Sequence, residues 1–312
     1  MLLRVLCAAV LVGVAGSGQA QQQALDELEG LRSILDQETA ALDALRQYHL
    51  TQQELIEWDV DMAQQLRMNG DQDAANAKLE EAGNRARLIG VAYGEFMGKY
   101  PQNPRGLTYY GEYLYDFTGE KAEAVRNWKL AERLDPELSI PLNNLGIHYC
   151  HSGDYSQGLR YFERTLELEP DNPDYLFNIV QIYLTNRQPV KTRYKWNDKK
   201  LYREAMKFSK RAAELDPTDF SLIQDYAVNF FAAEAFEVKV DWKEAMSAWV
   251  RARELATYPH EVFYTWLNEA RAAIKGHHYG RARTCLEEAL KLRPDSRVAN
   301  DLIGKLDKAE TT

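Results

Sequence analysis

A Leu-x-Pro tripeptide recurs along this chain, and its spacing constrains the fold more than any other feature. The tripeptides end at Pro136, Pro170, Pro217 and Pro294. The first two prolines are 34 residues apart, the third follows after 47 residues and the fourth after 77. The longer gaps are one or two 34-residue periods with extra residues inserted. Because proline cannot continue a helix, each tripeptide predicts a helix end and the turn that follows it.

Residues 139–172 show what lies between two of these marks. Apolar residues at three- and four-residue steps predict two short helices, Leu142–His151 and Ser156–Leu168, with a glycine turn between them. Gly146 and Gly158 lie inside these helices, where glycine costs about 1 kcal/mol relative to alanine, so they indicate close helix packing. Neither helix could bury its apolar face alone. The pattern therefore predicts a stack of similar units.

The period resembles that of the tetratricopeptide repeat, and small and aromatic residues recur in phase with it. In the units that begin at residues 105 and 263, these are Gly111, Tyr115, Gly119, Ala124, Trp128 and Ala131, and Trp266, Ala270, Tyr279, Ala282 and Ala289. The resemblance covers roughly 190 of the 312 residues. It implies an all-α solenoid of helix-turn-helix repeats, with an N-terminal helical segment and a C-terminal capping helix.

Four regions follow from this interpretation. We expect a signal peptide over residues 1–20, a helical segment with a degenerate repeat over 21–104, the repeat array over 105–296 and the capping helix over 297–312. Within the second region, we expect separate helices at Gln21–Tyr48, Thr51–Met68 and Asp71–Lys99. The first of these has a narrow leucine stripe (Leu25, Leu28, Leu31, Leu35, Leu42 and Leu45). The stripe fits either a coiled coil or a cap on the first repeat, and the cap is favoured because only about three heptads are present.

The N-terminus resembles a secretory leader. Arg4 precedes a short apolar run, and small residues follow at Gly18-Gln19-Ala20. The alternative is an uncleaved anchor. We expect export to the bacterial periplasm or beyond the cell, and no membrane span after cleavage, because no later apolar run approaches 20 residues.

Charge and cysteine content limit the possible partners. Residues 21–312 carry ten net negative charges, so nucleic acid is not an expected partner.

Cys150 and Cys285 lie in distant repeats, too far apart for a disulfide, which predicts two buried free thiols.

The sequence offers no convincing catalytic or metal constellation. His148 and His151 could share one helix face, but no third ligand is visible nearby. Glycines stand alone and follow no predicted strand, so no phosphate-binding loop is expected. We expect neither a cofactor, a metal nor an enzymatic activity.

The inner face of the array is the main candidate for binding, because the first helix of each repeat lines the concave side. The resemblance implies that the following side chains point there: Tyr109, Tyr113, Phe117, Asn143, Ile147, Phe177, Gln181, Gln224, Val228, Phe231 and Arg271. The alternative is that the protein's own N-terminal helices bury this face.

An insert of 13 residues in the third unit, within residues 186–200, is a second candidate. Residues 187–211 contain ten basic and two acidic side chains. The insert itself contributes Lys191, Arg193, Lys195, Trp196, Lys199 and Lys200. A basic loop for an acidic partner, a polysaccharide or anionic lipid is one interpretation. The other is a folded-back extension whose charges pair with the acidic N-terminal end or with another subunit.

These features together predict a non-catalytic scaffold that binds a protein or peptide in the concave groove. The alternative is a self-associating structural subunit, joined through its acidic N-terminal and basic insert surfaces.

Overall fold

The computed structural model describes the backbone of residues 18–310 and the side chains of Ser33 and residues 35–307. Residues 1–17 of the expected signal peptide, and with them Arg4, lie outside this range. Over the described residues the chain is all-helical, which confirms the expected fold class. The chain forms two compact units, one ending at Pro141 and one beginning at Leu142, and each is described by itself.

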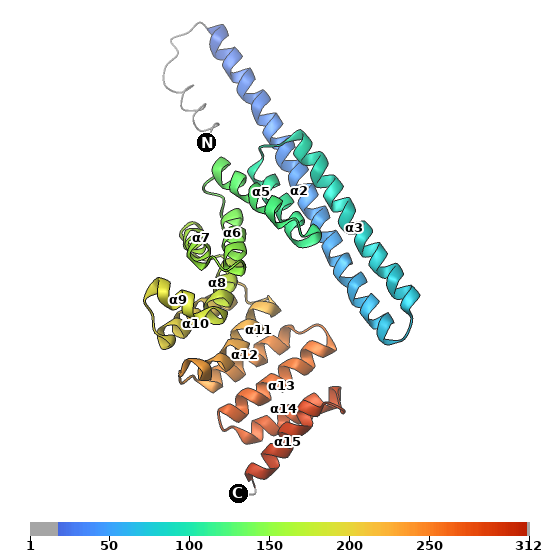
Figure 1. Cartoon of the computed structure of the whole chain (residues 1–312), viewed down its shortest axis with the longest axis vertical. Coiled ribbons are helices and arrows are strands. Elements are labelled where there is room, and N and C mark those ends of the chain that lie inside the picture. The colour runs from blue at the N-terminus through green and yellow to red at the C-terminus, as the bar shows by residue number, and fades with distance from the viewer. Residues whose placement is uncertain (1–17, 311–312) are drawn as a thin grey trace. The chain divides into compact units, whose positions relative to one another are not determined.

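The first unit combines a long helical hairpin with one repeat. Its elements are α2 (Gly18–Met68), α3 (Gln72–Lys99), α4 (Pro104–Tyr113), the π-helical segment η1 (Leu114–Thr118) and α5 (Lys121–Leu134). Helices α2 and α3 lie side by side (Figure 1). Helices α4 and α5 pack as the first helix pair, and Trp128 of α5 donates a hydrogen bond to the Thr108 carbonyl at 3.1 Å.

The predicted break between helices at Tyr48 and Thr51 is wrong. Helix α2 is a single helix of 51 residues, because no proline or glycine interrupts it there. Of its buried residues, Leu42, His49 and Ala63 are spaced in multiples of seven residues, and Asp59 lies four residues before Ala63. Four of the five buried residues of α3 recur every seven residues, Ala75, Ala82, Ile89 and Phe96, and the fifth, Tyr93, lies four residues after Ile89. This spacing is that of a coiled coil, so the two helices form an antiparallel coiled-coil hairpin. The side chains of Leu25, Leu28 and Leu31 lie outside the described residues.

The second unit continues the repeats. Its helices are α6 (Ser139–His151, whose first three residues precede the unit), α7 (Tyr155–Leu168), α8 (Pro173–Thr185), α9 (Arg187–Tyr194), α10 (Asp198–Leu215), α11 (Phe220–Asn229), the 3₁₀ segment η2 (Phe230–Phe236), α12 (Trp242–Leu255), α13 (Pro259–Lys275), α14 (Tyr279–Leu292) and α15 (Arg297–Glu310). Helix pairs α8–α10, α11–α12 and α13–α14 pack together, and α15 packs on α14 through the buried Ala299 and Leu306.

The two glycines singled out from the sequence do mark close helix contacts between α6 and α7. A Cβ atom on Gly146 would lie 3.2 Å from the Phe162 ring. One on Gly158 would clash with the Cys150 sulfur and lie 2.9 Å from the backbone nitrogen of Cys150 and the carbonyl oxygen of Gly146. Glycine is therefore required at position 158, because backbone atoms cannot move aside cheaply.

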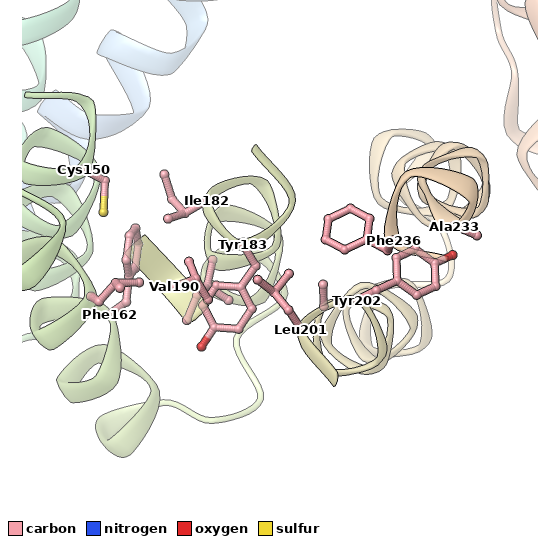
Figure 2. Close-up of a cluster of buried hydrophobic side chains, with 12 residues drawn as sticks. Cys150, Phe162, Ile182, Tyr183, Val190, Leu201, Tyr202, Ala233 and Phe236 are labelled. Carbon is pink, nitrogen blue, oxygen red and sulfur yellow. The ribbon is translucent and has the colours of Figure 1, made fainter. Parts of the chain in front are cut away.

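The insert in the third repeat, within residues 186–200, is a helix and not a loop. It forms α9, whose Val190 is fully buried in a cluster with Phe162, Tyr183 and Leu201 (Figure 2). Tyr194 and Trp196, at the end of the insert, stack on each other with ring centroids 4.6 Å apart and pack against the same cluster. The aromatic residues of the insert therefore stabilise the fold.

Candidate functional site

The N-terminal hairpin covers the inner face of the first repeat. Tyr109 and Tyr113 are only 7% and 8% exposed. The Arg46 guanidinium of α2 lies 4.4 Å from the Tyr109 ring centroid, and the Tyr113 ring lies 6.2 Å from that of Tyr93 on α3. The expectation that both tyrosines line an open groove is therefore wrong.

Two further contacts show how closely the hairpin fits this repeat. The Tyr113 hydroxyl occupies the space where a Cβ atom on Gly90 would lie, so only glycine lets α3 approach. Phe117, in the π-helical segment, is partly buried and lies 5.7 Å from the His49 ring. The alternative considered for the inner face, burial by the protein's own N-terminal helices, thus holds for this repeat.

His49 is a buried polar residue at the centre of this contact. It is 2% exposed, its Nδ1 lies 2.9 Å from the Tyr93 hydroxyl, and its Nε2 is buried without a hydrogen-bond partner. Burial and the nearby Arg46 guanidinium lower the pKa of His49 to about 4. The ring is therefore neutral at pH 7, and protonation would place a charge among aromatic rings.

We expect the stability of the first unit to fall as the pH drops from about 6.5 to 4. His49 in the unfolded chain has an ordinary pKa near 6.5. Between the two pKa values, the unfolded state therefore binds a proton that the folded state does not bind. The stabilisation is complete above pH 6.5 and is lost toward the folded-state pKa, at a cost of up to about 3 kcal/mol. Urea midpoints of the wild type and His49→Gln, measured between pH 7 and 4.5, test this. The His49→Gln slope should be shallower, whereas replacement of the exposed His260 should change nothing.

Within the second unit, several residues of the predicted inner face make side-chain contacts from one helix to the next. Asn178 of α8 donates a hydrogen bond to Asn143 of α6 at 3.2 Å. Gln181 of α8 donates to Asp225 of α11 at 2.7 Å. The Arg271 guanidinium of α13 lies 4.6 Å from the Phe231 ring centroid. Each of these contacts therefore includes at least one side chain that the sequence placed on the inner face, and only the Phe231–Arg271 contact joins two of them.

The exposure of these side chains varies. Asn143 is 6% exposed, and its amide oxygen accepts the hydrogen bond from Asn178. Arg271 is exposed. The remaining members are partly buried: Ile147, Phe177, Gln181, Gln224, Val228 and Phe231. The four apolar ones pack against the hydrophobic core. The face therefore offers amides, one cation and apolar edges.

Asp225 belongs to this face, although sequence reasoning missed it. Besides Gln181, its carboxylate accepts hydrogen bonds from Ser209 at 3.1 Å and Asn229 at 2.7 Å. Burial raises the pKa of Asp225, although these three donors oppose the shift. Nothing in the local sequence marks it, because Gln181 and Ser209 lie 44 and 16 residues away.

The basic insert uses part of its charge internally. Lys191 pairs with Asp198 at 2.9 Å, and Arg193 pairs with Glu163 at 2.6 Å. Lys200 lies 5.4 Å from the Trp196 ring centroid. Lys195 and Lys199 are exposed. The insert is thus folded back onto its own unit, as one of the two interpretations expected. The ion-pair partners described here are Asp198 and Glu163, however, and not the acidic N-terminal end or another subunit.

The remaining candidate groups show no reactive arrangement. Cys150 and Cys285 are free and buried, as expected, and burial raises the pKa of each thiol to about 12. Among the side chains of Ser33 and residues 35–307, no three His, Cys, Asp or Glu gather as metal ligands would. No helix in the described part of the chain combines the length and apolar character needed to cross a bilayer.

Comparison with known proteins supports the repeat assignment. Residues 140–172 match the family model of the tetratricopeptide repeat. The chain is 33% identical over 114 residues to the photosystem I assembly protein Ycf3 of Rippkaea orientalis, a match that covers 35% of this chain and 65% of that protein. The same protein of Acaryochloris marina is 29% identical over 112 residues, with 35% and 68% covered. The chain thus spans about two thirds of the length of these relatives.

Two solved structures share the fold at low identity. YrrB, described as a tetratricopeptide repeat protein with an unusual peptide-binding site, has a TM-score of 0.50 and 17% identity, covering 67% of this chain and 96% of YrrB. The C-terminal part of a repeat protein from Cytophaga hutchinsonii has a TM-score of 0.50 and 15% identity, with 83% and 98% covered. This protein is therefore a tetratricopeptide-type repeat protein in fold.

Proposed function

We propose that this protein is a non-catalytic scaffold that binds a segment of a protein partner along the inner face of α6, α8, α11 and α13. The observation that carries the proposal is the helix-to-helix continuity of that face, from Asn178 through Gln181 to Arg271. Amides spaced along a groove can hydrogen-bond an extended backbone, and partly exposed aromatic edges can anchor side chains. YrrB, which shares the fold, is described as having an unusual peptide-binding site, and this supports a peptide as the class of ligand.

The first repeat does not belong to this binding surface. Its inner face is occupied by the α2–α3 hairpin, so Tyr109 and Tyr113 act in folding. The proposed surface therefore begins in the second unit. Export through the N-terminal leader remains part of the proposal, and it rests on the sequence pattern alone.

Self-association through the basic insert has weaker support. Lys191 and Arg193 already pair with Asp198 and Glu163 within the same unit, which leaves less charge for a second subunit. Sedimentation at low and high salt would distinguish the two functions. A dimer that dissociates as salt rises would favour self-association.

Replacement of Gln224 and Arg271 by alanine is expected to weaken partner binding at least tenfold without unfolding the chain. Neither side chain is buried, so the fold should tolerate both changes. A random twelve-residue peptide library is panned against the full chain, and the dissociation constants of the selected peptides are measured by fluorescence polarisation. The matched control is the Glu204→Ala/Lys207→Ala double variant, which removes an ion pair on α10.

Two results would contradict the proposal. The first is a library that yields no peptide above background. The second is a set of peptides that bind the Gln224→Ala/Arg271→Ala variant as tightly as the wild type.

A further inference from the structure

Among the described side chains, two carboxylates are fully buried and both have cationic partners, whereas the partly buried Asp225 has none. Asp59 is 1% exposed and accepts from Lys78 at 3.3 Å and Arg85 at 3.1 Å. Glu269 is 1% exposed and lies between Arg253 and Arg281, each at 2.6 Å. The charge of a buried carboxylate is normally balanced in this way, because desolvation is costly.

The partners of Asp225 are all neutral. Gln181, Ser209 and Asn229 donate hydrogen bonds from α8, α10 and α11. These donors hold the carboxylate in one orientation without cancelling its charge. They are themselves tied together, since the Asn229 amide also donates to the Ser209 hydroxyl at 3.1 Å. The result is a rigid, partly buried negative charge.

The position of this charge suggests a ligand. Asp225 follows Gln224 on α11 and bonds to Gln181, and both glutamines are partly exposed members of the inner face. Asp225 itself keeps some exposure, so an incoming group can reach it. A lysine or arginine side chain would supply the missing counter-charge through a charge-assisted hydrogen bond.

We infer that Asp225 is the subsite for a cationic side chain, so the segment bound on the inner face carries a lysine or arginine at that position. This inference rests on the proposed function and narrows it to a class of partner. The raised pKa of Asp225 agrees with it, because three neutral donors leave the desolvation of the carboxylate partly uncompensated.

The test is a double-mutant cycle on peptides selected from the random library against the full wild-type chain. One arm changes the protein, Asp225→Asn, which keeps the size of the side chain and removes its charge. The other arm replaces the lysine or arginine of the peptide with norleucine. Each single change should weaken binding about tenfold, and the two together should weaken it little more than either alone, because both remove the same ion pair.

Controls separate this role from a structural one. Glu204→Gln on α10 removes one negative charge elsewhere and should leave peptide affinity unchanged. Ser209→Ala removes one hydrogen bond to Asp225 but keeps its charge, so the preference for lysine or arginine over norleucine should persist. If Asp225→Asn fails to fold, the norleucine peptides still show, on the wild-type protein, whether binding requires a lysine or arginine.

The outcomes are distinct. Selected peptides that lose affinity for Gln224→Ala/Arg271→Ala, yet show no enrichment in lysine or arginine, would overturn the Asp225 inference and leave the proposed function standing. Losses that are fully additive in the cycle would overturn it as well. A library that yields no binding peptide would instead contradict the proposed function.

Discussion

Replacement of Tyr113 by alanine is expected to destabilise the first unit by about 3–5 kcal/mol, the range found when large buried aromatic side chains are truncated. The ring is 8% exposed and lies 6.2 Å from the rings of Tyr93 and Tyr110 and 5.8 Å from that of Phe117. Its hydroxyl fills the space that Gly90 leaves open. Truncation would open a cavity between α3 and α4 that rigid helices cannot close.

Hydrogen exchange of the α3 backbone amides is the suitable measurement, because the two units can unfold at different denaturant concentrations. Exchange in α3 should accelerate in Tyr113→Ala, while exchange in α13 and α14 stays unchanged. Trp58→Ala is the matched control, since Trp58 is an aromatic residue of the same hairpin but 53% exposed. It should cost less than about 1 kcal/mol. If Tyr113→Ala leaves the protection of α3 unchanged but abolishes peptide binding, Tyr113 lines the binding groove and does not stabilise the first unit.

The coiled-coil hairpin shows where sequence reasoning stopped short. The heptad of α2 continues beyond Leu45, but two of its buried positions are then occupied by polar residues, His49 and Asp59. Their partners are Tyr93, Lys78 and Arg85, 19 to 44 residues away. A polar residue at an apolar position predicts the end of a helix stripe unless its partner is known. The sequence alone therefore did not reveal the full length of α2 or its packing against α4.

The repeats were easier to predict because each is defined by local marks. Gly146 and Gly158 lie where helices touch, and the proline tripeptides lie where helices end. The position of the extra residues in the third repeat was predicted correctly, but their conformation was not predicted. Lysine and arginine suggested a solvated loop, whereas Val190 and Tyr194 pack inward and the charges find Glu163 and Asp198. Composition indicates exposure only where no partner lies nearby in space.

Replacement of Glu269 by alanine is expected to destabilise the second unit by about 3–5 kcal/mol, since it would leave two guanidinium groups facing each other without their shared anion. Arg253 and Arg281 each bond to one oxygen of this carboxylate. They also flank Trp266, with the Arg253 guanidinium 3.4 Å and that of Arg281 5.9 Å from the ring centroid. One carboxylate thus holds α12, α13 and α14 together.

Thermal and urea unfolding of Glu269→Ala should show the loss, and Glu288→Ala is the control because its pair with Lys291 lies on the surface of α14. A triple variant, Arg253→Met/Glu269→Leu/Arg281→Met, identifies the cause. If the cost of Glu269→Ala comes from two unpaired charges, removing them should recover most of the stability. If the triple variant is as unstable as Glu269→Ala, the loss comes from packing around Trp266 instead. A change below about 1 kcal/mol in Glu269→Ala would show that the triad is not needed to hold the three helices.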